Sequence, residues 1–228
     1  MKIKNFSLVL AIVAMSVSSA SAQNFFWSLS DIGGGAANSD LTIDTNASPS
    51  GTVFLYYADN GQAITEGLDL DFTWTNNDVV EFTAAETFEA DITFGPGGPP
   101  INDRWGDNFG PASDVQANSV SGFTTVNVVN GTGIQPEHAP GVLNDDGFDL
   151  VDTLYDTSNN SFLIGSINYN TLTDAETSIL VSGLVVDGGA DIGASFSGLT
   201  FAGAAIPEPS TAGLLALGLV GLVSRRRR

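Results

Sequence analysis

The sequence predicts an all-β fold, a single antiparallel β-sandwich formed by residues 23–205. Three observations lead to this prediction. Leu68, Leu70, Phe72 and Trp74 alternate with polar residues, and a period of two places these apolar side chains on one face of a strand. Elsewhere, short runs of Val, Ile, Phe and Tyr are separated by Gly, Asn, Asp, Ser and Thr, which form turns. No segment of this region keeps a convincing helical period.

The remaining strands are placed on the β-branched and aromatic runs that turn residues bound. In chain order they are Thr52–Ala58, Val79–Thr83, Glu89–Phe94, Val120–Val129, Ser161–Tyr169, Ser178–Val186 and Ile192–Phe201. Ala84–Glu89 is the one candidate for a helical turn. Many short strands joined by polar turns are typical of a sandwich or a jelly roll, in which two sheets share one core.

The first 22 residues predict a signal peptide that is removed on export. Positively charged residues at the start precede an apolar segment at Phe6–Val17, and small residues at Ala20 and Ala22 precede Gln23. Signal peptidase recognises this order of positive, apolar and small residues. We therefore expect a short hydrophobic helix at 1–22 and a mature chain that begins at Gln23.

Residues 206–228 predict a second processing signal. Its parts are a tripeptide, an apolar run and an arginine tail, namely Pro207, Glu208 and Pro209, then Ser210–Val223, then Arg225, Arg226, Arg227 and Arg228. The prolines resist packing into a sheet or helix. A helix of 14 residues would be about 21 Å long, short of the roughly 30 Å hydrocarbon core. We expect a short transmembrane helix that anchors the chain transiently, with the arginines on the cytoplasmic side.

This order of tripeptide, apolar run and arginines closely resembles the PEP-CTERM sorting signal of exported bacterial proteins. The resemblance implies a membrane protease of the exosortase type as a partner, with cleavage near the tripeptide. It implies that the chain is anchored in the inner membrane before processing. Afterwards the protein is expected at the cell surface or in the extracellular matrix.

Residues 23–205 are strongly acidic. Six of the seven basic residues lie in the two end signals, and Glu208 is the one acid that does, so this region has 25 acids against the single base Arg104, a formal charge of −24. Such a surface repels phosphates, which excludes nucleic-acid binding. The acids either form a solvated surface or bind cations, and salt should stabilise the fold by screening in both cases. Because cysteine is absent, a hydrophobic core must carry the stability.

Two long loops interrupt the strand pattern, at Gly95–Pro111 and at Gly131–Gly147. Loops of this length in a compact domain are often functional. The first contains Arg104 and Trp105, which mark it as a candidate ligand loop, and Arg104 is expected to pair with Asp103, with Asp107 or with a more distant acid. The second contains the single histidine, His138, which we predict to be exposed.

Other aromatic residues could stack on the apolar faces of sugars. Phe26, Tyr56 and Trp74 are instead expected in the core because they lie at strand positions. Catalysis has few candidates. Glycoside hydrolysis would need a carboxylate pair, and Asp69 and Asp71 stand about 7 Å apart on one strand face. Since that face is opposite the apolar one, we expect both in solvent and predict no enzyme activity.

One turn offers ligands for calcium. Asn144, Asp145, Asp146 and Asp149 surround the turn residue Gly147, and Ca²⁺ takes about six to eight oxygen ligands of these kinds. The spacing of an EF-hand loop and its closing glutamate are missing. Asp, Asn and Gly also form turns without any metal. The sequence requires no cofactor, and calcium is the one candidate ion that it suggests.

Two stretches resemble cohesin modules. Gly67–Phe82 combines an alternating strand, a turn with Asn and Asp, an apolar pair and an aromatic residue, and Gly165–Phe201 is similar to the closing strands of these modules. The resemblance implies a jelly-roll sandwich. It matches no residue that contacts a dockerin partner, and the loop at Gly95–Pro111 departs from the pattern.

These observations together lead to three functional hypotheses. The first is an exported, non-catalytic protein of the cell surface or extracellular matrix that is associated with exopolysaccharide. The second is a carbohydrate- or protein-binding module on the cohesin-like sandwich. The third, ranked last, is a glycoside hydrolase.

Overall fold

The computed structural model describes residues 25–31, 39–59, 63–65, 67–105, 114–127, 132–187, 190–191 and 193–203. The predicted signal peptide at 1–22 and sorting signal at 206–228, with the helix expected in each, lie outside the described residues. In the part of the chain that is described, no helix is long and apolar enough to cross a membrane.

The all-β prediction is confirmed, because one short 3₁₀ turn is the sole helix within those ranges. The elements are β1 (Phe25–Ser28), β2 (Leu41–Asp44), β3 (Ser50–Ala58), β4 (Gly67–Trp74), β5 (Val80–Thr87), β6 (Asp91–Phe94), β7 (Pro100–Asp103), β8 (Asp114–Gln116), β9 (Ser119–Asn127), η1 (Pro136–His138), β10 (Leu150–Asp152), β11 (Tyr155–Asp156), β12 (Ser161–Thr171), β13 (Thr177–Asp187), β14 (Ala190–Asp191) and β15 (Leu199–Ala202).

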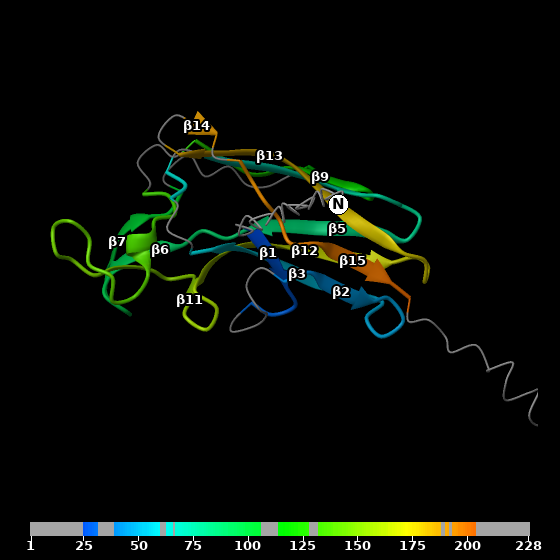
Figure 1. Cartoon of the computed structure of the whole chain (residues 1–228), viewed down its shortest axis with the longest axis horizontal. Helices are drawn as coiled ribbons and strands as arrows, with labels where there is room; N and C mark the ends of the chain where they lie inside the picture. The colour runs from blue at the N-terminus through cyan, green and yellow to red at the C-terminus, as the bar shows by residue number, and fades with distance from the viewer. Residues whose placement is uncertain are drawn as a thin grey trace, which may run out of the picture.

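The strands form two large sheets that face each other and a small third sheet beyond one end (Figure 1). One large sheet has the order β1–β3–β12–β11, with β5 also paired to β12. The other has the order β2–β15–β13–β4–β9–β8, with β14 on β13, and the small sheet has the order β10–β6–β7. Among the described strands, β2 and β15 pair in parallel. The prediction of a wholly antiparallel sandwich is therefore wrong at this edge.

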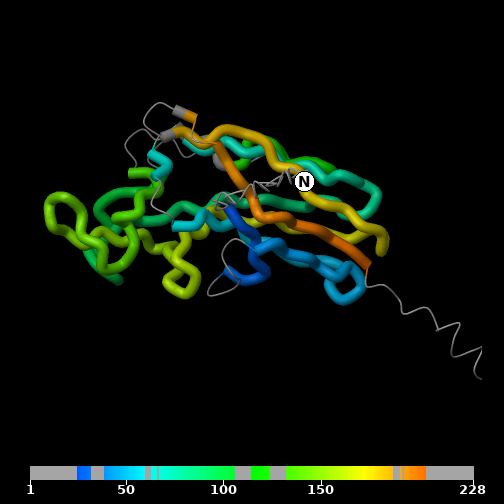
Figure 2. Tube along the Cα trace, viewed as in Figure 1, coloured from blue at the N-terminus to red at the C-terminus, as the bar shows by residue number. Residues whose placement is uncertain are grey.

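The first and last strands of the domain are tied together (Figure 2). Phe25 of β1 forms a parallel bridge with Phe196, just before β15. Its N–H donates to the carbonyl of Ser195 at 2.9 Å, and its carbonyl accepts from the N–H of Ser197 at 2.8 Å. Since β1 belongs to one sheet and β15 to the other, these bonds join the two sheets along one side.

One core fills the space between the two large sheets. The ring of Phe72 on β4 packs edge-on against Trp27 on β1, with centroids 5.4 Å apart, and against Phe123 on β9 at 5.3 Å. Tyr169 on β12 and Phe201 on β15 pack in the same way at 4.6 Å. The four apolar residues of the alternating segment are all buried and the residues between them are exposed. The period-two prediction for this strand is confirmed.

A second apolar cluster lies on the β1–β3–β12 sheet. It is made by Phe26, Tyr56, Ala58 and Leu163, with the rings of Phe26 and Tyr56 stacked at 5.3 Å. The prediction that Phe26, Tyr56 and Trp74 are buried is confirmed, although the first two pack in this cluster and only Trp74 lies in the main core. The sheet therefore buries apolar side chains in two separate clusters.

The structure differs from the sequence prediction at several elements. The helical turn predicted at Ala84–Glu89 is wrong, because β5 continues to Thr87 and Ala84 and Ala85 pair with β12. Pairing with a neighbouring strand here overrides the helical preference of alanine. The loop predicted at Gly95–Pro111 contains strand β7, which pairs with β6. Seven of the described strands, each of two to four residues, are additional to those predicted, namely β1, β2, β7, β8, β10, β11 and β14.

Candidate functional site

Arg104, the single base of residues 23–205, is fully buried against Asp152 of β10. Its Nε donates to Oδ2 of Asp152 at 2.7 Å, and its Nη2 donates to Oδ1 at 2.7 Å. Its Nη1 donates to the carbonyl of Leu163 at 2.6 Å. Two parallel charge-assisted bonds fix the angle as well as the distance between the groups. Both side chains of this candidate ligand loop are fully buried, so neither is exposed to a ligand at the surface. The acid that pairs with Arg104 is Asp152, which lies 48 residues away in the sequence.

The backbone of Arg104 is also hydrogen-bonded on both sides. Its N–H donates to the carbonyl of Ala90 at 2.8 Å, and its carbonyl accepts from the N–H of Gly133 at 2.8 Å. Gly133 has a positive φ of 67°, and a Cβ at this position would lie 2.1 Å from the carbonyl oxygen of Ile64. Only glycine fits there without strain. The segment after β7 is thus clamped between two other parts of the chain.

A bulge in β12 supplies the third bond of Arg104. The register of β12 against β3 shifts between Leu163 and Gly165. The carbonyl of Leu163 accepts from Arg104, and the carbonyl of Ile164 accepts from the N–H of Phe88 at 2.8 Å. Trp105 adds a bond from its Nε1 to the carbonyl of Phe88 at 3.1 Å. The bulge therefore leaves the carbonyls of Leu163 and Ile164 available to Arg104 and Phe88, whereas a regular strand would have bonded them to its neighbouring strands.

His138 lies beside this ion pair, at the end of η1, and is 1% exposed. Its predicted exposure is wrong. Burial lowers the pKa of His138; the charge of Asp152 opposes this shift in pKa and the charge of Arg104 adds to it. Within the described residues its Nδ1 has no hydrogen-bond partner. A neutral, enclosed imidazole is suited to packing and poorly placed to act as a general base.

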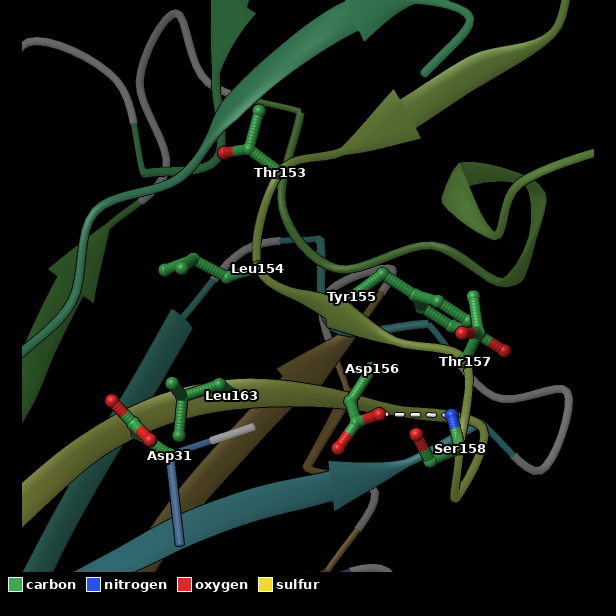
Figure 3. Close-up of a pocket in the computed structure, with 8 residues that line it drawn as sticks. All are labelled: Asp31, Thr153, Leu154, Tyr155, Asp156, Thr157, Ser158 and Leu163. Atoms are coloured by element: carbon green, nitrogen blue, oxygen red, sulfur yellow. Dashed lines mark hydrogen bonds between the residues drawn. The ribbon is translucent and has the colours of Figure 1, made fainter. Parts of the chain in front are cut away.

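The backbone that follows Asp152 forms one wall of a cleft of about 240 Å³ (Figure 3). Eight residues line it, namely Asp31, Thr153, Leu154, Tyr155, Asp156, Thr157, Ser158 and Leu163. Oδ1 of Asp152 also accepts the N–H of Leu154 at 2.8 Å, and the carbonyl of Leu154 accepts the N–H of Leu163 at 3.0 Å. The buried ion pair therefore contacts both walls of the cleft.

Two carboxylates, those of Asp31 and Asp156, belong to the lining of the cleft. Burial raises the pKa of Tyr56, and the charges of Asp156 and Asp31 raise this pKa further. The Tyr56 hydroxyl donates to the carbonyl of Ser30 at 3.0 Å. In Figure 3, a hydrogen bond of 2.8 Å joins the N–H of Ser158 to Oδ1 of Asp156. Two carboxylates on the lining would repel an anionic ligand.

Tyr155 and the neighbouring hydroxyl groups give the cleft its hydrogen-bonding capacity. Burial raises the pKa of Tyr155, and the charge of Asp59 raises this pKa further. The Tyr155 hydroxyl donates to Oδ2 of Asp59 at 3.1 Å. Thr157 and Ser158 add hydroxyl groups to the rim. Carboxylate acceptors with hydroxyl donors suit a neutral, polyhydroxylated ligand.

The predicted calcium turn lies in the loop before β10. Oδ1 of Asn144 accepts the N–H groups of Asp146 at 3.1 Å and Phe148 at 2.8 Å, and Oδ1 of Asp149 accepts the N–H of Gly141 at 2.9 Å. These bonds are the turn chemistry that the sequence left open as the alternative. The described residues contain no group of three or more acidic or histidine side chains placed to hold a metal ion. Calcium binding here stays a prediction.

The residues predicted for processing lie outside the described residues. They are Ala20, Ala22 and Gln23 at the signal-peptide end, and Pro207, Glu208, Pro209, Arg225, Arg226, Arg227 and Arg228 at the sorting end. The cleft, in contrast, was missed by sequence reasoning. Thr153 to Ser158 carry no motif, and the contacts that form the cleft depend on Asp152 and Leu163 meeting Arg104.

Comparison with protein-family models finds the PEP-CTERM protein-sorting motif at residues 205–228. The chain therefore carries this motif, as the sequence predicted. The motif implies export and transient membrane anchoring before processing. No curated protein matches the sequence.

Among solved structures, the fold is similar to the seventh ScaB type I cohesin from Pseudobacteroides cellulosolvens. The identity is 10% and the TM-score 0.37, with 75% of this chain and 92% of that chain covered. It is also similar to a chain of the complex of CaDoc0917 with CaCohA2, at 9% identity and a TM-score of 0.37, with 79% of this chain and 99% of that chain covered. Cohesins are the modules that Gly67–Phe82 and Gly165–Phe201 resemble. A likeness this loose transfers no ligand and no site.

The ion pair can be tested with a double-mutant cycle. Arg104→Met should lower the free energy of unfolding by about 3–5 kcal/mol, because it leaves the Asp152 carboxylate buried without a counter-ion. Asp152→Asn keeps the acceptor for Leu154 and should cost a similar amount. The double variant should cost clearly less than the two single costs added together. Urea unfolding measures all four proteins, and simple additivity would contradict the coupling.

The buried histidine predicts a pH dependence. Because the pKa of His138 is lower in the folded chain than in the unfolded chain, only the unfolded chain binds a proton as pH falls below about 6.5. Stability should be complete above that pH and fall below it, by up to about 1.4 kcal/mol per pH unit. His138→Gln should remove this slope between about pH 5 and 7. Equal slopes in both proteins by chemical unfolding would refute the assignment.

The calcium prediction is tested by comparing cations at matched ionic strength. Screening of the −24 charge should raise the melting temperature in Na⁺ and in Ca²⁺. If the loop binds Ca²⁺, the ion should add about 2.7 kcal/mol at a hundredfold excess over Kd. Asp145→Asn with Asp149→Asn would abolish this excess while keeping the Asp149 acceptor for Gly141. Equal effects of the two cations in both proteins would show that the site does not exist.

Proposed function

We propose that residues 23–205 form a non-catalytic extracellular domain, which the sorting motif delivers to the cell surface or extracellular matrix, where it is associated with exopolysaccharide. The observation that carries this proposal is the PEP-CTERM motif at 205–228. In this proposal signal peptidase removes 1–22, and an exosortase-type protease acts at the tripeptide. The mature protein is then the acidic β-domain alone.

The surface charge of the domain supports an extracellular role. The single base of residues 23–205 is buried in an ion pair, and His138 is buried and uncharged above its lowered pKa. Every charged side chain left to face solvent is therefore acidic. Such a surface stays soluble and binds cations diffusely. A polysaccharide partner would be neutral, or acidic and bridged by divalent cations.

The positions of the candidate catalytic groups support the absence of catalysis. His138 is enclosed beside Arg104 and cannot reach a substrate from its buried position. Asp69 and Asp71 face solvent on β4, and Oδ1 of Asp71 accepts the N–H of Gly122 at 3.0 Å. Neither carboxylate is desolvated as a general acid would need to be.

The second candidate function is binding of a neutral carbohydrate in the cleft of Figure 3. The observation that favours it is the lining itself, with carboxylate acceptors, hydroxyl groups and the side of Tyr155. Sugar hydroxyls donate to such acceptors, and the ring offers an apolar surface. In this alternative the domain is the binding module and the sorting motif places it outside the cell.

The processing part is tested by intact mass in a host that has the matching protease. The surface-localised protein should begin at Gln23 and end near the tripeptide, without the arginine tail. Pro207→Ala with Pro209→Ala should keep the tail and hold the protein in the membrane, because the extended geometry of the tripeptide is lost. Pro49→Ala, in the turn before β3, serves as the control and should be processed normally. A mature protein that still carries Arg225–Arg228 would contradict the proposal.

The cleft is tested by titrating neutral polysaccharides, including neutral exopolysaccharide from the host. Asp156→Asn keeps the acceptor for the Ser158 N–H but removes the charge, and should weaken binding about tenfold. Asp114→Asn, on the exposed strand β8, is the matched control and should change nothing. Equal binding by both variants would refute the cleft as the binding site.

A further inference from the structure

Exposed apolar side chains are concentrated on one lobe of the molecule. This lobe consists of the small β10–β6–β7 sheet and the loop at 141–149. Nine large apolar residues are exposed among the described residues, and five of them belong to the lobe, namely Phe94 at 48%, Ile101 at 44%, Val142 at 42%, Leu143 at 63% and Phe148 at 52%. Single exposed apolar residues need no explanation, whereas a cluster marks an interaction surface.

Two of these residues touch each other and define the centre of the surface. The rings of Phe94 and Phe148 lie 5.7 Å apart at 67°, edge to face. Phe94 ends β6 and pairs with Leu150 of β10, and Phe148 stands two residues before Leu150. We call this contact the Phe94–Phe148 patch. Both rings remain about half exposed after meeting, so the contact leaves apolar area uncovered.

Hydrogen bonds hold the patch in one conformation. The N–H of Gly95 donates to the carbonyl of Asp149 at 2.8 Å, which ties the end of β6 to the loop. Asn144 donates its N–H to the carbonyl of Phe148 at 2.9 Å, and its Oδ1 accepts the N–H of Phe148 at 2.8 Å. A surface that is already ordered loses little entropy when it binds. The loop that was predicted to bind calcium therefore presents Phe148.

The surroundings of the patch are acidic. Asp145 and Asp146 are exposed in the same loop, next to Phe148. Because every exposed charge of residues 23–205 is negative, a second copy of this chain would be repelled at close range. The edge-to-face rings also offer no flat platform for a sugar. Charge complementarity instead favours a cationic protein partner.

We propose that the Phe94–Phe148 patch docks an extracellular protein that presents an apolar side chain framed by lysine or arginine. The apolar side chain would cover the two rings, and the basic residues would face Asp145 and Asp146. This arrangement of a buried centre with a polar rim is the usual anatomy of protein interfaces. That the partner is extracellular rests on the proposed function, whereas the patch and the chemistry of its partner depend neither on the sorting motif nor on the cleft.

The probe is a fluorescent peptide of alternating Lys and Leu, titrated into the protein purified from its host. Phe94→Ser with Phe148→Ser should raise the Kd about thirtyfold, as expected for the centre of an interface. Leu180→Ser with Leu184→Ser is the matched control, since it removes two side chains of 58% and 52% exposure from β13 and leaves all charges in place. This control should change the Kd less than threefold.

Two further peptides separate the contribution of apolar contact from the contribution of charge. Replacing Leu by Ser in the peptide should give weak binding that is the same for all variants, and replacing Lys by Glu should abolish binding. If Phe94→Ser with Phe148→Ser unfolds the lobe, Phe148→Ser alone, in the loop, replaces it and should still weaken binding. The proposal is overturned if both double variants weaken binding equally or not at all. Binding of a neutral glucan that depends on the patch would also overturn it.

Discussion

The structure depends on the buried ion pair between Arg104 and Asp152. A charged pair removed from water is costly unless nearly all of its hydrogen-bonding groups are satisfied. Here the carboxylate accepts two N–H groups of Arg104 and the N–H of Leu154, and a third N–H group of Arg104 meets the carbonyl of Leu163. The single base of residues 23–205 therefore lies in the interior, where it bonds three separate parts of the chain. The charged side chains that remain on the surface are all acidic.

The pair connects the two features that could bind a partner. Asp152 ends β10, whose other end adjoins the Phe94–Phe148 patch, and it holds Leu154 in the wall of the cleft. Arg104 follows β7 of the lobe and contacts β12 of the large sheet. The lobe is thus bonded to the main domain through side chains as well as through the chain. Both surfaces are presented on a fixed frame, which reduces the entropy lost on binding.

What could be predicted from the sequence depended on how local the signal was. The alternation at Leu68–Trp74 and the order of parts at 206–228 are contained in consecutive residues, and the burial of the first and the family match of the second agree with them. The partner of Arg104 is 48 positions away, and any of 25 acids could have been chosen. Phe94 and Phe148 likewise meet only because β6 pairs with β10.

Native-state hydrogen exchange tests the role of the ion pair most directly. In the wild-type protein, the amides of Arg104, Gly133 and Leu154, which are bonded at the pair, should exchange within about tenfold of the amides of β4 because they open with the core. In Arg104→Met they should exchange on the order of a hundredfold faster than the β4 amides of the same variant, since the lobe would then open separately. The same ratio of exchange rates in both proteins would contradict the claim that the pair fastens the lobe to the domain.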